Sequence, residues 1–228
     1  MKATRAAVYC GTRNLYEKMP TAAKSLLYNS NVDRVYFLIE DDEFPEYLPE
    51  TIETINVSGQ EFFYRGGPNW SSPWTWMVLM RAALHRVFSD LDRILSLDVD
   101  TIVVKDISEM WDWPMDNCWL AGANEVMKSQ TEHMYYINCG VMMQNLKKLR
   151  EDGKGDQIIE KLNRFGYEYN EQDCINRYCQ GGILEMASDY NASYYTRPTK
   201  SPKIVHFASV RNYIEHPLYI KYRDMPWR

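Results

Sequence analysis

The 228-residue sequence lacks a long hydrophobic run, a block of basic residues and a paired-cysteine motif. No segment approaches the roughly 20 apolar residues of a membrane span, and the N-terminal stretch is too polar for a signal peptide. The 26 Lys and Arg residues against 31 Asp and Glu give a net charge of −5, with no Lys/Arg cluster of the kind that binds nucleic acid. We therefore expect a cytoplasmic protein without a transmembrane segment and without a nucleic-acid partner.

Cysteine is present in an odd number, and no two cysteines have the Cys-x-x-Cys spacing of a zinc or redox pair. We expect reduced, mostly buried thiols at Cys10, Cys118, Cys139, Cys174 and Cys179. Aromatic residues, by contrast, are abundant: they make up 14% of the chain, including 7 Trp and 17 Tyr. This exceeds what a core of this size needs and indicates surfaces on which a ligand can stack.

Apolar strands alternate with helical segments along the whole chain. The patterns predict strands over 6–9, 34–40, 51–57, 93–105 (a strand pair), 118–123, 135–144 and 203–207, and helices over 19–29, 74–88, 146–151, 156–165 and 172–179. This alternation predicts one α/β domain with a mainly parallel sheet. Ligands of such sheets bind beyond the carboxyl ends of the strands, where the loops at Thr12, Asp98 and His206 lie.

Two carboxylates, Asp98 and Asp100, interrupt the apolar segment 93–105. On extended backbone, residues i and i+2 project to the same side and can share one divalent cation. Chance alone gives about four acid-x-acid pairs in this composition, and a pair that caps a turn between two strands is the alternative. His206 ends the apolar segment KIVHF and would complete a mixed oxygen and nitrogen site suited to Mn²⁺ or Mg²⁺. A core histidine is the alternative there.

Four segments occur in order: LDRILSLDVDTIVV, YYINCGVMMQNLKKLR, NEQDCINRYCQGG and KIVHF, with Arg81 placed 17 residues before Asp98. In this combination the chain resembles glycosyltransferase family 8, which includes glycogenin and bacterial lipopolysaccharide galactosyltransferases. The resemblance implies a single GT-A domain over 1–228, Rossmann-like and flanked by helices. Its nucleotide-binding half would be 1–105, ending in the Asp-x-Asp motif, and its sugar and acceptor half 106–228. It also implies a metal-dependent, retaining hexosyltransferase.

The same resemblance implies roles for individual residues. Asp98, Asp100 and His206 would coordinate Mn²⁺ or Mg²⁺, which neutralises the charge of the leaving diphosphate. Glu171, Gln172 and Arg81 would be catalytic, the first two stabilising charge at the anomeric carbon. The donor would be a nucleotide sugar, UDP-glucose, UDP-galactose or an N-acetyl form, and the acceptor a glycan or other hydroxyl compound. Residues around the donor would be Thr12, Asn14, Tyr16 (against the base), Arg81, Asp98, Val99, Asp100, Glu125, Asn138, Gly140 and Arg211.

The sequence departs from the family pattern at three places. Glu171 stands where the family has Asp, and the early loop offers Thr12, Arg13 and Asn14 in place of the acid that commonly reads uracil. Arg211 lies in a segment that replaces the usual Lys-Pro-Trp and would supply a phosphate-binding cation. Taken singly, Arg81 also suits a surface cation, 138–140 a β-bulge and 172–176 a helix start.

Two other functions share the acid–metal pattern. One is a nucleotide-diphosphate-sugar hydrolase or nucleotidyltransferase, and the other is a catalytically idle relative that binds nucleotide sugars. Five tryptophans near the expected site predict an acceptor cleft, with core packing as the alternative: Trp70, Trp74, Trp76, Trp111 and Trp113. No feature of the sequence indicates an oligomeric state.

Overall fold

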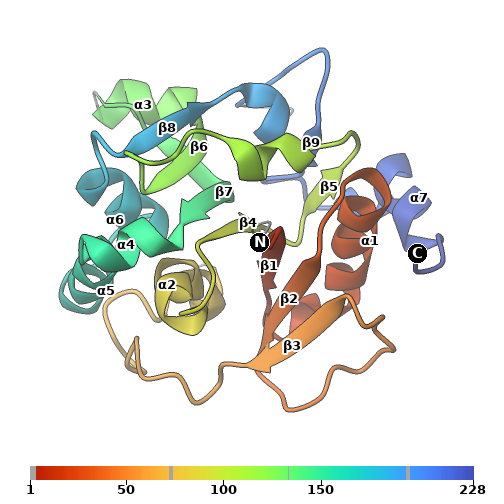
Figure 1. The fold of residues 1–228 in the computed structure, drawn as a ribbon, viewed down its shortest axis with the longest axis horizontal. Coiled ribbons are helices and arrows are strands. Elements are labelled where there is room, and N and C mark those ends of the chain that lie inside the picture. Colours follow the sequence, from red (N-terminus) through yellow and green to blue (C-terminus); the bar gives the residue numbers. More distant parts are fainter. Residues whose placement is uncertain (1–3, 72–73, 133, 194–195) are drawn as a thin grey trace.

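The structure is a computed structural model that describes residues 4–71, 74–132, 134–193 and 196–228. A seven-stranded sheet in the order β3-β2-β1-β4-β7-β6-β8 forms its centre (Figure 1). The strands are β1 Ala6–Cys10, β2 Arg34–Ile39, β3 Ile52–Asn56, β4 Arg93–Leu97, β6 Leu120–Asn124, β7 Ile137–Asn145 and β8 Ile183–Met186. The first four strands pair in parallel, β7 is antiparallel to β4 and β6, and β8 is parallel to β6. The sheet is therefore mostly parallel, as expected.

The helices lie on both faces of this sheet (Figure 1). They are α1 Met19–Asn29, α2 Leu84–Val87, α3 Val126–Glu132, α4 Leu146–Glu151, α5 Lys154–Arg164, α6 Asn170–Tyr178 and α7 Pro217–Arg223. The 3₁₀ helices are η1 Arg13–Lys18, η2 Trp76–Ala83, η3 Ser108–Asp112, η4 Ser188–Asn191 and η5 Tyr213–Glu215. Among the described residues, no helix combines the length and the hydrophobicity that a membrane crossing needs.

Strand β1 shows how the sequence builds a core on each face. Its side chains alternate, because successive residues of a strand point to opposite faces. Ala7 and Tyr9 pack in the cluster that contains α1, whereas Ala6 and Val8 pack in the cluster that contains α2, α4, α5 and α6. An apolar run without polar alternation is what a parallel strand covered on both faces requires.

A second sheet has two strands and lies next to the turn that contains Asp98 and Asp100. Strand β5 (Thr101–Val103) pairs antiparallel with β9 (Ile204–His206), and this register sets Thr101 opposite His206. A small apolar cluster that includes Val205, Phe207 and Tyr219 fixes β9 against helix α7. Residues about a hundred positions apart in the sequence are thereby brought side by side.

The segment 74–88 differs from the single helix predicted for it. It forms the 3₁₀ helix η2, followed by the one-turn helix α2. Two of its carbonyl groups bind side chains: Val78 accepts from Nε of Arg81 at 3.4 Å, and Arg81 accepts from Nε2 of Gln144 at 3.1 Å. Apolar periodicity does not distinguish the two helix types, because both bury residues three positions apart. Strand β8 and helices α3 and α7 are further elements that the sequence patterns did not predict.

Candidate active site

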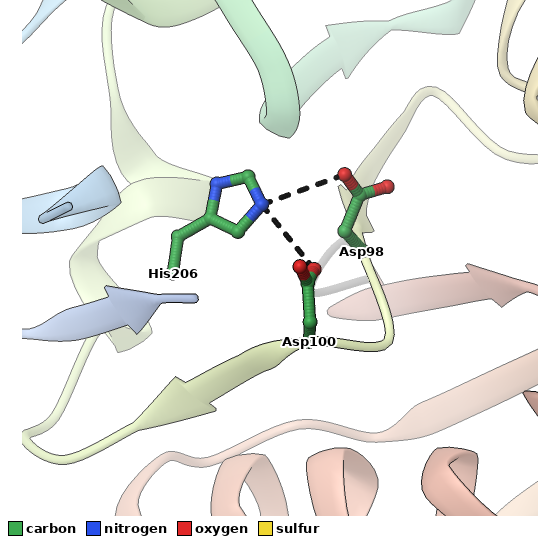
Figure 2. Close-up of side chains that lie close together, drawn as sticks. All are labelled: Asp98, Asp100 and His206. Carbon is green, nitrogen blue, oxygen red and sulfur yellow. Dashed lines mark ion pairs between the residues drawn. The ribbon is translucent and has the colours of Figure 1, made fainter. Parts of the chain in front are cut away.

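Asp98 and Asp100 lie in the turn that joins β4 to β5. The carbonyl of Asp98 closes this turn by accepting from the backbone N–H of Thr101 at 3.2 Å and from its hydroxyl at 2.6 Å. The turn, rather than the extended backbone predicted, brings the two carboxylates together. Both face the imidazole of His206, which arrives from β9 (Figure 2). The turn-capping interpretation and the metal interpretation are thus compatible.

The donor atoms of these three residues suit a divalent cation. Nε2 of His206 lies 3.3 Å from Oδ1 of Asp100 and 3.6 Å from Oδ2 of Asp98, and one ligand atom from each residue lies within 4.8 Å of the others. Two carboxylates with one imidazole form a set that Mn²⁺ accepts well. Burial acts to raise the pKa of Asp100, but His206, a backbone hydrogen bond and the charge of Arg81 together lower it by more, so this pKa lies below its usual value.

Gly140 leaves the space that this group of side chains needs. A methyl group at position 140 would lie 2.2 Å from Cε1 of His206 and 2.8 Å from Oδ2 of Asp98. The backbone carbonyl of Gly140 also accepts from the N–H of Asp98 at 2.8 Å. A residue with a side chain would displace the ligands, so glycine here fits the proposed metal site.

Arg81 is buried beneath the carboxylates of Asp98 and Asp100, with 8% of its surface exposed. Its Nη1 donates to Oδ1 of Asp98 at 2.6 Å and to the carbonyl of Cys139 at 3.0 Å, while Nη2 pairs with Glu171. Burial raises the pKa of Glu171 to about 7, although the charge of Arg81 acts to lower it. Arg81 is therefore not a surface cation but the link between the Asp-x-Asp turn and helix α6.

Asn138 and Gln172 are held by the irregular start of β7. The β6–β7 register shifts from Asn124 opposite Ile137 to Gly122 opposite Met142, so β7 carries extra residues at this point. Irregular strands of this kind occur beside active sites, where they re-aim side chains. Oδ1 of Asn138 accepts from the N–H of Gly140 at 3.0 Å, and Oε1 of Gln172 accepts from the N–H of Cys139 at 2.9 Å.

A cleft of about 730 Å³ opens above these residues. This volume lies in the range of small-molecule sites. The residues predicted from the sequence that line it are Arg81, Asp98, Asp100, Glu125, Asn138, Gly140, Glu171, Gln172 and His206. They come from six separate parts of the chain, so the fold assembles most of the predicted site in one place.

The remaining predicted donor residues are not among the residues that line this cleft. Among the described residues that line it, Thr12, Asn14, Tyr16, Val99 and Arg211 are not included. Tyr16 is 5% exposed, and its hydroxyl donates to Asp41 at 3.0 Å while accepting from the N–H of Glu40 at 2.7 Å. The hydroxyl of Thr12 donates to Asn14 at 2.6 Å, and Arg211 is exposed. Their roles toward the nucleotide stay predictions.

The tryptophans divide between the core and the mouth of the cleft. Trp74 lines the cleft, is 43% exposed and lies 5.4 Å from the ring of Tyr169, whose face Lys128 covers at 4.5 Å. Trp111 belongs to the core, where its indole N–H donates to the carbonyl of Ala6 at 3.1 Å. Trp70 and Trp76 stack on each other at 4.8 Å, and Trp113 packs on Tyr190. Of the five tryptophans predicted near the site, Trp74 is therefore the one that lines the cleft in the described part of the chain, together with its neighbour Tyr169.

Two buried polar residues of the site were not predicted. Arg197 is 1% exposed and pairs with Glu125, and Asn191 is 0% exposed and contacts His206. Asn191 ends η4 and Arg197 lies between η4 and β9, in a stretch without helical or strand periodicity. In the sequence Asn191 begins an Asn-x-Ser triplet, a pattern that points to the surface rather than to a buried site.

The mostly parallel sheet carries an Asp-x-Asp turn after β4, and β9 of the second sheet brings His206 to that turn, an arrangement that matches the GT-A type of glycosyltransferase fold. The family model Glycosyl transferase family 8 matches residues 7–211, and the chain belongs to this family. The nucleotidyltransferase alternative is accordingly not favoured.

Known proteins similar to the chain include enzymes and solved structures. The lipopolysaccharide 1,2-glucosyltransferase of Escherichia coli is 27% identical over 135 residues, which are 51% of this chain and 40% of that protein. The structure of the bifunctional glycosyltransferase WbbM has a TM-score of 0.78 at 14% identity and covers 100% of this chain and 51% of its own. The galactosyltransferase LgtC, solved with donor and acceptor sugar analogues, has a TM-score of 0.72 at 18% identity. The match covers 96% of this chain and 95% of the LgtC chain. The chain spans about half the length or less of the curated relatives it matches, from 40% to 47%.

Proposed function

We propose that the chain is the catalytic domain of a metal-dependent, retaining hexosyltransferase. It would move a hexose from a nucleotide sugar to a hydroxyl group of a glycan or similar acceptor. The observation that carries this proposal is the convergence of Asp98, Asp100 and His206 at one side of the cleft, beside the Arg81–Glu171 ion pair. Family membership supports the same reaction class.

Asp98, Asp100 and His206 would hold Mn²⁺ or Mg²⁺. When bound, such a cation supplies charge neutralisation for the diphosphate that leaves the sugar. Arg81 fixes Asp98 from below through a 2.6 Å hydrogen bond, so that carboxylate keeps its orientation as charge develops in the site. Because Arg81 and Glu171 compensate each other, the buried pair adds little net charge of its own.

The donor sugar would lie between Asn138, Glu125 and Gln172. Oε1 of Glu125 is buried without a hydrogen-bond partner in the described residues, so this carboxylate oxygen is available to accept from a sugar hydroxyl. Glu171 and Gln172 would stabilise the positive charge at the anomeric carbon. We propose UDP-glucose, UDP-galactose or an N-acetyl form as the donor.

Residues 1–105 would form the nucleotide-binding half and 106–228 the sugar and acceptor half. Thr12, Asn14, Tyr16 and Arg211 would contact the nucleotide at the end of the cleft next to β1. The acceptor would stack on Trp74 and Tyr169, since aromatic faces bind the apolar faces of sugar rings. We place the protein in the cytoplasm, which is consistent with its five free cysteines.

The test is a titration of the purified protein with Mn²⁺ and a panel of nucleotide sugars. Binding of Mn²⁺ is followed by the loss of the free-ion EPR signal, and release of the nucleotide diphosphate is followed with and without sugar acceptors. We expect metal-dependent donor turnover in the wild type and its loss in Asp100→Ala. Asp116→Ala is the matched control, because the Asp116 side chain is 93% exposed. Unchanged turnover in Asp100→Ala, or no metal-dependent binding of any nucleotide sugar, would refute the proposal.

A further inference from the structure

Asn191 joins the metal-binding side of the cleft to its sugar-binding side. It ends helix η4 and is fully buried. Its Nδ2 donates to Oδ1 of Asn138 at 3.0 Å and to the Asn138 carbonyl at 3.4 Å, and its Oδ1 lies 2.9 Å from Nδ1 of His206. One amide thus contacts a metal ligand and a donor-side residue at the same time.

The surroundings fix which end of this amide is nitrogen. Oδ1 of Asn138 already accepts from the N–H of Gly140 at 3.0 Å, so it faces Asn191 as an acceptor, and the Asn138 carbonyl accepts as well. The Asn191 atom that meets these two oxygens must therefore be its NH₂ group, which carries two donors. At the other end, Nη2 of Arg197 lies 3.4 Å from Oδ1 of Asn191 and donates to it, which fits an oxygen there.

This orientation decides the protonation of His206. An amide oxygen only accepts, so Nδ1 of His206 must carry the hydrogen that bridges the 2.9 Å contact. A neutral imidazole with a proton on Nδ1 has its lone pair on Nε2. Nε2 is the atom that faces Asp100 at 3.3 Å and Asp98 at 3.6 Å, and it would need to be unprotonated to coordinate a cation there.

Arg197 holds Asn191 in place from behind. Nε of Arg197 donates to the Asn191 carbonyl at 2.7 Å, and Nη1 forms an ion pair with Glu125. Asn138 donates to the same Glu125 carboxylate at 3.3 Å. Because the Arg197 side chain is 0% exposed, its charge depends on Glu125 for compensation, and neither residue can turn away without leaving a buried charge unpaired.

We propose that Asn191, anchored by Arg197, is a positioning residue that holds His206 in the Nδ1–H tautomer and thereby sets the affinity of the Asp98–Asp100–His206 site for divalent cations. The outer partners of metal-binding histidines fix the tautomer in this way, and removing them typically costs about 10- to 100-fold in metal affinity. The proposal rests on the proposed metal-dependent function, but its first measurement needs no metal.

The tautomer is read from ¹H–¹⁵N spectra of the imidazole groups in the metal-free protein labelled with ¹⁵N-histidine. The chain has 4 histidines, so the His206 signals are identified by comparison with His206→Gln. We expect a proton on Nδ1 of His206 in the wild type. Asn191→Ala should show a mixture of tautomers. A wild-type His206 that carries a proton on Nε2 and none on Nδ1 would overturn the proposal without any substitution at Asn191.

The second measurement is Mn²⁺ affinity by EPR or calorimetry. Asn191→Ala should bind Mn²⁺ about 10- to 100-fold more weakly than the wild type. The matched control is Asn69→Ala, because Asn69 is also buried at 2% and donates to the carbonyls of Leu162 and Phe165 at 2.6 and 2.7 Å, away from the cleft. This control should lose stability but keep wild-type affinity.

The two proposals fail in different ways. If the wild type binds Mn²⁺ and Asn191→Ala binds it equally well, the positioning role is wrong and the proposed function stands. If the wild type binds no Mn²⁺ while the metal-free spectrum shows the Nδ1–H tautomer, the metal-dependent function fails instead. Circular dichroism of each variant identifies one that does not fold, in which case the wild-type spectrum decides on the tautomer.

Discussion

Gly140 and His206 are packed so closely that any side chain at position 140 would overlap the imidazole, with the nearest approach at 2.2 Å. Gly140→Ala should therefore displace His206 or the bulged start of β7. We expect a loss of about 1–3 kcal/mol in stability, the usual cost of overpacking a buried site, together with weaker Mn²⁺ binding. Thermal unfolding and EPR titration measure the two effects.

Gly59→Ala is the control for this substitution, because a methyl group at position 59 would meet no atom within 4 Å. It should change neither stability by more than about 0.5 kcal/mol nor Mn²⁺ affinity. If Gly140→Ala bound Mn²⁺ as tightly as the wild type does, glycine would not be needed at position 140 to make room for the ligands.

Replacement of Arg81 should be among the most damaging single changes in the chain. Arg81→Met leaves the carboxylates of Asp98 and Glu171 facing each other without their shared cation. Removing one partner of a buried ion pair costs about 3–5 kcal/mol, so we expect a loss of that size in chemical denaturation. Adding Glu171→Gln should restore part of this stability, because one of the two orphaned charges is then gone.

An exposed pair on the same stretch of chain provides the comparison. Arg86 pairs with Asp156, and both side chains are about half exposed, at 55% and 48%. Arg86→Met should cost no more than about 1 kcal/mol, as solvent screens such pairs. Equal losses of unfolding free energy for Arg81→Met and Arg86→Met would contradict the prediction that the buried Arg81 ion pairs stabilise the fold more than the exposed Arg86 pair does.

Glu171 should make the stability of the metal-free protein depend on pH. Burial raises its pKa from the ordinary 4.5 to about 7. A carboxyl group whose folded-state pKa is raised contributes stability that is present below about pH 4.5 and is lost as the pH rises through about 7. The whole change amounts to about 3 kcal/mol.

Glu171→Gln removes this titration, so the difference in unfolding free energy between wild type and variant should shift in favour of the variant between pH 5 and pH 8. Denaturant unfolding at each pH gives this difference directly. Asp100 does not interfere, since its lowered pKa places its own titration below the usual 3.8. A difference that is constant across the range would show that Glu171 is ionised throughout.

Trp74 gives a test of the proposed acceptor surface. Trp74→Ala should raise the KM for a sugar acceptor about tenfold, which corresponds to a stacking contribution of about 1.4 kcal/mol. Donor hydrolysis without acceptor should be unchanged, because the ring lies at the mouth of the cleft and not among the metal ligands. Tyr47→Ala, at a ring that is 78% exposed and outside the cleft, is the control. An equal rise in donor KM would place Trp74 on the donor side instead.

The convergence of Asp98, Asp100 and His206 was predictable because local and long-range signals agree. Apolar residues flank Asp98 and Asp100 on both sides, which predicts a buried strand pair. Two carboxylates between such strands cost free energy to bury unless they have a partner. His206 ends another apolar segment, and the β5–β9 pairing then places it opposite Thr101. Each of these residues can therefore be recognised from its flanking sequence, and the fold brings the separate segments together.

Asn191 and Arg197 were not predictable for the opposite reason. Their partners, Asn138, Glu125 and His206, lie between 15 and 72 positions away, in strands and turns that do not adjoin them in sequence. The residue type alone does not indicate whether an Asn or Arg is buried, and the segment around these two residues shows no hydrophobic periodicity of a helix or strand. Only the three-dimensional structure shows that their hydrogen bonds are internal.

The pairing of β5 with β9 also has a consequence for how the site forms during folding. The two strands close a loop of about a hundred residues, and closing a long loop costs chain entropy before the contacts that reward it exist. A chain that has folded only as far as β8 holds both carboxylates of the turn but lacks the imidazole. Acquisition of full Mn²⁺ affinity would therefore report the docking of the last strand, and so the completion of folding.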